Sequence, residues 1–319
     1  MLPGIVSLWR AVFSDWRRAY PQVVRRHRWI GVSAWIVGCM LVWHGVGGAQ
    51  QRVLSPGERH GRWHTAQVSA EVPRIQGPLT IFTAASLTEA FKELGANIEQ
   101  ANPGTKVIFN FAGSPTLRTQ LAQGARADVF ASADEPNMQG AQKEGTIASE
   151  PRFFVRNQLA VIVPAANPAQ VMRLQDLAKP GVKLVLTNKK VPVGNYSRQA
   201  LAKMSQNAAF GSEFATRVLA NLVSEETNVK QVVAKVQLGE ADAGIVYASD
   251  VTPAVRRAVQ VLAIPKPFNV IAQYPIAVVR DAPNAAGARA FIDYVLSPAG
   301  QAILTKHGFL AVAPTPRTN

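Results

Sequence analysis

The most regular feature of the sequence is an alternation of two hydrophobic patterns that begins at Leu79. Short β-branched and aromatic runs are typical of buried strands, and apolar residues recurring every three or four positions are typical of amphipathic helices. Strands are predicted at residues 79–83, 106–111, 128–131, 159–163, 183–187, 243–247 and 276–279. Helices are predicted through residues 87–94, 117–122, around 138, 174–177, 197–204, 213–222, 229–238, 285–296 and 298–307. This order predicts an α/β fold with mostly parallel sheets and flanking helices.

The first predicted strand leads directly into a predicted helix at Ser86. Glu89 follows three residues later, which completes a Ser-x-x-Glu capping box. Because a helix start presents free backbone N–H groups and the positive end of the helix dipole, this turn can hold an anion. Taken alone, an ordinary capped turn is the simpler interpretation.

Similar small-residue turns recur along the chain. Ser114 follows the second predicted strand, and Pro115 suits a first helical turn, where its missing N–H is not needed. Residues 191–196 form a tight segment with small side chains, and residues 225–229 form a helix start with Asn or Thr as the cap. Tyr247 ends a strand and offers a hydroxyl group. Because α/β folds place ligands at the carboxyl ends of parallel strands, these segments are candidates for one binding site.

The sequence offers little for catalysis. His307 is the only His beyond residue 64, and Cys39 is the only Cys of the chain, so the folded part lacks the residues for a Ser-His-Asp triad or a His- or Cys-ligated metal. Asp128 with Asp134, or residues 225–226, could supply paired carboxylates, but their positions beside a strand and before a helix suit structural roles. We therefore expect no catalytic residue, no direct ligand of a metal cation and no cofactor.

The first 75 residues differ in composition from the rest of the chain. They hold all six Trp, ten Arg, no Lys and three acidic residues, so half of the net charge of +14 comes from less than a quarter of the sequence. The remaining basic residues are spread thinly and do not cluster with aromatic residues. Nucleic-acid binding is therefore not expected.

An uncharged, apolar run of twenty residues, 29–48, follows the basic cluster at residues 25–28. It fits the hydrophobic part of a cleaved export signal first, and a retained membrane anchor second. A third possibility is lipidation of Cys39, which follows a lipobox-like Ile-Val-Gly sequence. All three place the rest of the chain outside the cytoplasmic membrane, because the basic residues mark its inner side. Residues 1–49 are thus predicted to be an export signal or anchor, and residues 50–77 a linker.

Six segments of the α/β region resemble, in order and spacing, the periplasmic molybdate-binding proteins of ABC transporters. They are residues 82–87 (FTAASL), 111–117 (FAGSPTL), 127–134 (ADVFASAD), 191–194 (VPVG), 244–247 (GIVY) and 274–279 (YPIAVV). The resemblance covers about residues 77–312 and leaves the first 75 residues uncovered.

This resemblance implies a two-lobed, type II solute-binding fold with the ligand cleft between the lobes. One lobe would comprise residues 78–157 and 274–319, and the other residues 158–273. The chain would cross between the lobes near residues 156–158 and again near residues 273–275.

The resemblance also implies five ligand-binding residues. Ser86 and Ser114 would give hydroxyl and backbone donors from one lobe. Val193 and Val229 would give backbone N–H groups from the other lobe, and Tyr247 its phenolic O–H. Val193 stands where the family often has Ala, which bears on the size of the pocket and not on the backbone donor.

The resemblance implies that the protein is a monomer that captures molybdate or tungstate outside the cytoplasmic membrane, in the periplasm, and delivers it to a membrane permease of an ABC transporter. A site that only donates hydrogen bonds suits a fully ionised tetrahedral dianion, whereas a protonated phosphate would need an acceptor. The alternatives are another oxyanion such as sulfate, an enzyme such as a transferase on the same fold, and a cytoplasmic regulator. The regulator would need a DNA-binding helix pair before residue 78, where the uncharged run lies instead. Molybdate and tungstate nearly coincide in size and charge, so both stay open.

Overall fold

The computed structural model describes residues 72–312 of the 319-residue chain. The predicted export signal or anchor with Cys39, and most of the predicted linker, lie outside the described residues. The linker ends earlier than predicted, because Ile75 is buried in the core and its N–H donates to Asn102 Oδ1 at 2.9 Å. Between residues 72 and 312, no helix has the length and apolar character needed to cross a membrane.

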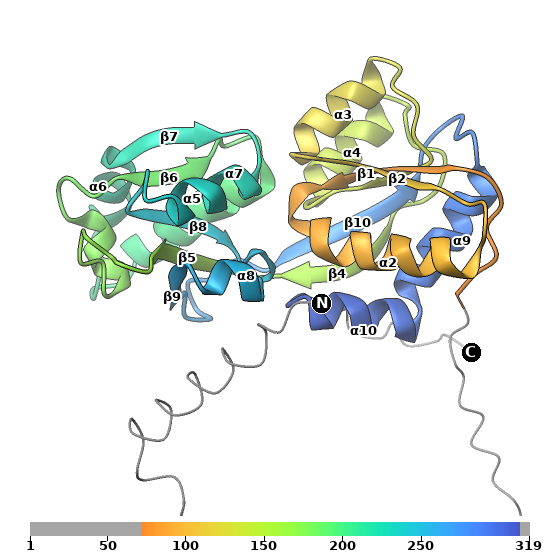
Figure 1. Cartoon of the computed structure of the whole chain (residues 1–319). Coiled ribbons are helices and arrows are strands. Elements are labelled where there is room, and N and C mark those ends of the chain that lie inside the picture. The colour runs from red at the N-terminus through yellow and green to blue at the C-terminus, as the bar shows by residue number, and fades with distance from the viewer. Residues whose placement is uncertain (1–71, 313–319) are drawn as a thin grey trace, which may run out of the picture. The chain divides into compact units, whose positions relative to one another are not determined.

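Two β-sheets with their helices make up this part of the chain (Figure 1). The six-stranded sheet has the order β11 (Leu310–Ala311), β4 (Arg152–Asn157), β10 (Ala272–Val278), β3 (Val129–Ala131), β1 (Leu79–Ala84) and β2 (Val107–Ala112). The five-stranded sheet has the order β7 (Leu222–Glu226), β6 (Leu184–Thr187), β8 (Ala243–Tyr247), β5 (Leu159–Pro164) and β9 (Val259–Ala263). We call the first sheet and its helices lobe 1, and the second sheet and its helices lobe 2.

The predicted helices form in both lobes, together with two short helices of lobe 2, residues 248–250 and 253–256, that were not predicted. Lobe 1 contains η1 (Ala85–Leu87), α2 (Thr88–Ala101), α3 (Ser114–Ala122), α4 (Glu135–Lys143), α9 (Ala285–Leu296) and α10 (Pro298–Lys306). Lobe 2 contains η2 (Leu174–Ala178), α5 (Pro192–Ser205), α6 (Phe214–Ala220), α7 (Val229–Gln237), η3 (Ala248–Asp250) and α8 (Pro253–Arg256). The elements labelled η are short 3₁₀ helices.

The α/β fold class is confirmed, but the sheets are mixed and not mostly parallel. The pairings of β1 with β2 and β3, and of β6 with β7 and β8, are parallel. The pairings made by β10, β4, β11, β5 and β9 are antiparallel. The prediction missed β4, β7, β9 and β11, because these strands are partly exposed and do not form long, uninterrupted apolar runs.

The sheet of lobe 1 is covered on both faces, as the two-residue period of a strand allows. Ile81 and Val129 belong to the larger core, which includes residues of α2, α9 and α10. Phe82 and Phe130, their neighbours along β1 and β3, belong to a separate cluster with residues of α3 and α4. Figure 1 shows α3 and α4 on the opposite side of this sheet from α2 and α10.

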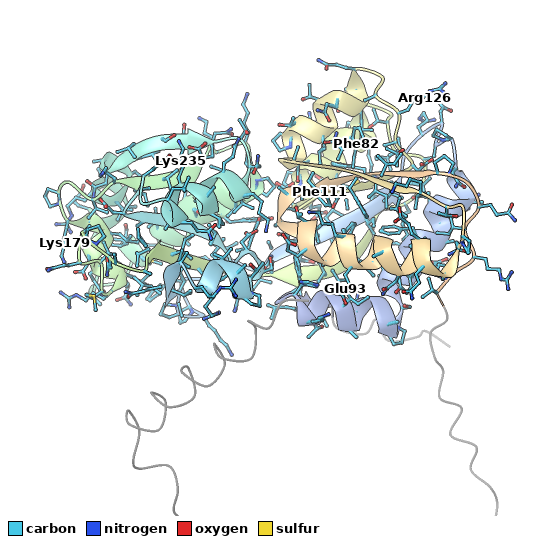
Figure 2. All side chains as sticks on the ribbon, in the orientation of Figure 1. Phe82, Glu93, Phe111, Arg126, Lys179 and Lys235 are labelled. Carbon is cyan, nitrogen blue, oxygen red and sulfur yellow. The ribbon has the colours of Figure 1, made fainter. Side chains whose placement is uncertain are left out.

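The last helix of lobe 1 is joined to α2 through Glu93, which Figure 2 labels beside α10. Lys306 Nζ donates to Glu93 Oε1 at 2.8 Å, and His307 Nε2 lies 2.8 Å from Oε2. The hydrogen bonds from these two side chains hold the pKa of the Glu93 carboxyl below its ordinary value, although partial burial opposes this.

The chain passes between the lobes twice. The first passage is at Gln158, between β4 of lobe 1 and β5 of lobe 2. The second occupies residues 264–271, between β9 and β10. It ends before the predicted residues 273–275, because Tyr274 already pairs with Val155 in the sheet of lobe 1.

Candidate functional site

The five predicted ligand-binding residues all line one pocket between the two lobes. Its empty space, including the part open to solvent, is about 230 Å³. The lining residues are Ala84, Ala85, Ser86, Ala112, Gly113, Ser114 and Ala133 from lobe 1, and Val191, Pro192, Val193, Asn228, Val229 and Tyr247 from lobe 2. None of these described lining residues is charged, so hydroxyl groups, backbone groups and the Asn228 amide supply the polarity of the pocket.

The strand directions explain why these residues meet. Ser86 and Ser114 follow the carboxyl ends of β1 and β2, which are parallel. Val193 and Val229 follow the carboxyl ends of β6 and β7, and Tyr247 is the last residue of β8. Because β6 runs parallel to both β7 and β8, these three ends lie at one edge of the lobe 2 sheet. The pocket therefore lies where the parallel parts of both sheets end.

Ser86 does not cap a helix, so the predicted capping box is wrong. Ser86 lies within η1, the N-cap of α2 is Leu87, and no side chain caps either segment. The Ser86 hydroxyl instead lies 3.0 Å from Tyr274 OH. The short 3₁₀ turn moves the start of α2 past Ser86 and leaves Ser86 at the pocket wall.

Ser114 is the first residue of α3, with Pro115 in the first turn as predicted. Its Oγ accepts a hydrogen bond from the N–H of Ala133 at 3.0 Å. Because that backbone group can only donate, the Ser114 proton stays available for another acceptor. Ser114 thus presents both a hydroxyl proton and a first-turn N–H group at the pocket wall.

In lobe 2 the pocket is bordered by two helix starts. The predicted tight segment at residues 191–196 is the start of α5, whose N-cap is Val191 and whose first turn contains Val193. A Cβ on Gly194 would overlap the carbonyl oxygens of Thr187 and Asn188, so glycine lets this helix start pack on the end of β6.

The start of α7 has the predicted cap. Asn228 accepts a hydrogen bond from the N–H of Gln231 at 3.3 Å, and Val229 is the first helical residue. First-turn N–H groups have no partner within their helix, and the helix dipole places partial positive charge there. Val193 and Val229 therefore offer backbone donors with an electrostatic preference for an anion.

Tyr247 contributes a buried hydroxyl. Tyr247 lines the pocket, and its buried OH has no hydrogen-bond partner among the residues that the structure describes. Burial raises the pKa of Tyr247 well above its ordinary value, so the phenol keeps its proton. Its backbone N–H donates to Asp250 Oδ2 at 3.1 Å, and Lys230 Nζ lies 3.3 Å from the other carboxylate oxygen. Tyr247 is thus held in place as a neutral donor.

The carboxylates that could have formed an acid–base pair have structural partners. Asp128 accepts backbone N–H groups from two segments of lobe 1, and Asp134 caps α4. Residues 225–226 lie at the end of β7, and their carboxylates pair with Arg198 and Lys235. Across residues 72–312, no group of three His, Cys, Asp or Glu side chains is placed to hold a metal cation.

Two features of the site were not predicted from the sequence. Gly113 lies against Thr227 of the other lobe so closely that a Cβ there would overlap the Thr227 carbonyl oxygen. Behind Ser86, Tyr274 also contacts Asn157. Both depend on contacts between residues far apart in sequence, and neither Tyr274 nor Asn157 differs in pattern from an ordinary buried strand residue.

Comparisons with known proteins agree with this architecture. Residues 79–310 match the family described as bacterial extracellular solute-binding protein. The molybdate-binding protein ModA of Mycobacterium tuberculosis H37Rv is 38% identical over 284 residues, covering 88% of this chain and 98% of that protein. ModA of Escherichia coli K12 is 31% identical over 242 residues, covering 73% of this chain and 89% of that protein.

A solved structure shares the two-lobed fold. The periplasmic molybdate-binding protein of Azotobacter vinelandii superposes with a TM-score of 0.63 at 21% identity, covering 74% of this chain and all of that chain. With the family match and the two relatives, this fold shows that the chain belongs to the bacterial extracellular solute-binding proteins.

Proposed function

We propose that this protein captures molybdate, or the closely similar tungstate, outside the cytoplasmic membrane and delivers it to the permease of an ABC transporter. The observation that carries the proposal is the pocket itself, whose polar groups are hydroxyls and helix starts without a charged side chain. The relatives named as molybdate-binding proteins support the choice of ligand.

The donors suit a tetrahedral dianion. Ser86, Ser114 and Tyr247 would donate through their hydroxyls, and Val193 and Val229 through their backbone N–H groups. Hydrogen bonds to a charged group stabilise by about 1.5–3 kcal/mol each, so a few of them can offset the cost of removing the ion from water. The dipoles at the starts of α3, α5 and α7 spread the negative charge over several peptide groups.

Binding would require both lobes, because each supplies only part of the donor set. Closure of the lobes around an ion follows the hinge motion common in two-lobed binding proteins. We propose that the protein binds its ligand without chemical change and acts as a monomer in the periplasm. Residues 1–49 would direct export or keep the protein at the membrane.

Calorimetric titration of the full chain with molybdate, tungstate, sulfate and phosphate tests this function. Molybdate and tungstate should bind with similar affinity, sulfate more weakly and phosphate most weakly. Phosphate needs an acceptor for its proton, and none of the five proposed ligand groups is a carboxylate. No binding heat with any of the four anions would overturn the proposal, and phosphate binding as tight as molybdate would contradict the donor-only site.

A further inference from the structure

Four buried side chains form a hydrogen-bonded chain behind the pocket, which we call the buried polar chain. Ser86 Oγ lies 3.0 Å from Tyr274 OH, and Tyr274 OH lies 3.3 Å from Asn157 Nδ2. Asn157 Nδ2 also lies 2.8 Å from Ser249 Oγ. Ser86, Tyr274 and Asn157 belong to lobe 1, and Ser249 belongs to lobe 2, in η3 directly after β8. All four residues are at least nine-tenths buried.

The backbone of Gln158 sets the direction of these hydrogen bonds. Its N–H can only donate, and it donates to Asn157 Oδ1 at 3.0 Å. The other end of the Asn157 amide is therefore the NH₂ group, which donates to Ser249 Oγ and to Tyr274 OH. Tyr274 OH is thus an acceptor toward Asn157.

The donor and acceptor of the hydrogen bond between Tyr274 and Ser86 follow from this assignment. Tyr274 keeps its proton, because burial raises the pKa of its hydroxyl above the ordinary value. Tyr274 OH makes two hydrogen bonds among the described residues, and its partner in one of them, the Asn157 NH₂ group, can only donate. The proton of Tyr274 therefore finds its acceptor in Ser86 Oγ, 3.0 Å away. Ser86 then accepts from Tyr274, and the Ser86 proton is left for the pocket that this residue lines.

We propose that Asn157 and Tyr274 are positioning residues that fix the Ser86 hydroxyl as a hydrogen-bond donor. Because of this orientation, the site binds tetrahedral anions without a proton more tightly than anions of equal charge that carry a proton. This inference rests on the proposed function. An anion that carries a proton would bring an O–H group against the Ser86 proton, and one of the two would lack an acceptor. A buried donor left unpaired is costly, so such an anion is disfavoured even when its charge and size fit.

Tyr274→Phe and Asn157→Leu test this inference from two sides. Tyr274→Phe removes the proton donor to Ser86, and Asn157→Leu removes the donor to Tyr274, so that Tyr274 can accept the Ser86 proton. The readout is the ratio of the phosphate Kd to the sulfate Kd, measured on the full chain at about pH 8, where phosphate is mostly a dianion with one proton. Where the phosphate heat is small, displacement of molybdate by phosphate and by sulfate gives the same ratio.

In both variants the ratio should fall by about two- to tenfold relative to wild type, the effect of one neutral hydrogen bond. Tyr294→Phe is the matched control: Tyr294 is a buried tyrosine of lobe 1 whose OH also accepts from an asparagine, Asn97, at 3.2 Å, but it does not line the pocket. Its ratio should equal that of wild type.

Three results would overturn the inference: an unchanged ratio in both variants, an equal loss of affinity for all anions, and the same fall in Tyr294→Phe. Thermal melting shows which variants fold, and the ratio of the phosphate Kd to the sulfate Kd in either folded variant tests the inference. Failure of the wild-type chain to bind any of the anions would instead overturn the proposed function.

Discussion

The two lobes prepare their sides of the pocket differently. In lobe 1, each serine hydroxyl has a partner within the same lobe: Ser86 lies against Tyr274, and Ser114 accepts from Ala133. In lobe 2, the Tyr247 hydroxyl is buried without a hydrogen-bond partner in residues 72–312. Lobe 1 therefore orients its hydroxyls before a ligand arrives, whereas the Tyr247 hydroxyl of lobe 2 is left free to bond a ligand that enters the pocket.

This difference affects stability and affinity in opposite ways. A buried polar group without a partner costs about 1–3 kcal/mol, and a ligand that supplies the partner recovers that free energy on binding. A hydroxyl that is already hydrogen-bonded stabilises the free protein, and it is oriented before the ligand arrives. Removing a hydroxyl from either lobe should therefore weaken ligand binding. Only the substitution in lobe 1 should also lower the stability of the free protein.

The largest effect is expected where the lobes touch. Gly113 has a φ of −65°, which every residue adopts, so only the space in front of Thr227 restricts this position. Gly113→Ala should hold the lobes apart and deprive the anion of one lobe's donors. We expect molybdate affinity to fall about 100-fold or more, the equivalent of roughly 2.7 kcal/mol, in calorimetric titration.

Gly140→Ala is the control for this substitution. Gly140 lies in α4 of the same lobe, and the nearest atoms to a Cβ there belong to the guanidinium of Arg118, the end of a flexible, partly exposed side chain. This variant should bind as wild type does. Wild-type affinity in Gly113→Ala would show that the contact with Thr227 does not belong to the ligand-bound state.

The hydroxyls of Ser86 in lobe 1 and Tyr247 in lobe 2 should differ in their effect on stability. Ser86→Ala and Tyr247→Phe should each weaken molybdate binding by about tenfold or more, since each removes one hydrogen bond to a charged ligand. In the absence of ligand, Ser86→Ala should lower the melting temperature because the Tyr274 proton loses its acceptor. Tyr247→Phe should leave it unchanged or raise it, because the variant removes an unpaired buried hydroxyl.

Melting curves with and without molybdate check this comparison. A free Tyr247→Phe protein that melts well below wild type would mean that the Tyr247 hydroxyl already has a partner. The contrast between the lobes would then be wrong.

The backbone N–H of Val229 in lobe 2 can be tested separately from the hydroxyls. Val229 is the first residue of α7 and follows an extended Asn228, the position where proline fits a helix best. Val229→Pro removes the N–H group, together with the buried valine side chain, and should lower molybdate affinity by about tenfold, with the helix retained. Val229→Ala keeps the N–H and should bind nearly as tightly as wild type. Equal affinities in the two variants would remove this N–H from the site.

The smallest effect is expected far from the pocket, at Glu93 of lobe 1. Hydrogen bonds from Lys306 and His307 lower the Glu93 pKa, so this carboxylate stabilises the folded state at pH values above its ordinary pKa of 4.5. The stabilisation is lost as the pH falls through the lowered pKa of the folded state. Glu93→Gln should therefore melt at a slightly lower temperature than wild type near neutral pH, and the difference should vanish in acid.

Molybdate affinity should not change in Glu93→Gln, because Glu93 does not line the pocket. A stability difference that grows as the pH falls would contradict the assigned ion pair.

The convergence of the pocket residues could be predicted because it follows from local patterns. Apolar runs located the strands, and small residues with a hydroxyl or a cap located the turns after them. Since β1 and β2 are parallel, as are β6, β7 and β8, residues at their carboxyl ends meet without further information. The expectation of mostly parallel sheets was wrong for two reasons. The strands β4 and β9 were missed, because their partly exposed residues hide the strand pattern. The predicted strands β5 and β10 run antiparallel to β8 and β3, a direction that the order of elements does not show.

The surroundings of the pocket residues could not be predicted in the same way. Ser86 was expected to cap its own helix, but its hydroxyl meets Tyr274, 188 positions away in sequence. The approach of Gly113 to Thr227 likewise joins two lobes. A short-range pattern describes only the neighbours of a residue along the chain, so it identifies a donor without showing what orients that donor.

The most direct test of the central claim is a crystal structure of the chain grown with molybdate, with the molybdenum located by its anomalous scattering. We predict one strong peak in the pocket, with anion oxygens about 2.7–3.2 Å from donors of both lobes. These donors are the hydroxyls of Ser86, Ser114 and Tyr247 and the N–H groups of Val193 and Val229. A molybdenum peak elsewhere, an anion held by one lobe alone, or a lysine or arginine side chain bonded to it would contradict the account.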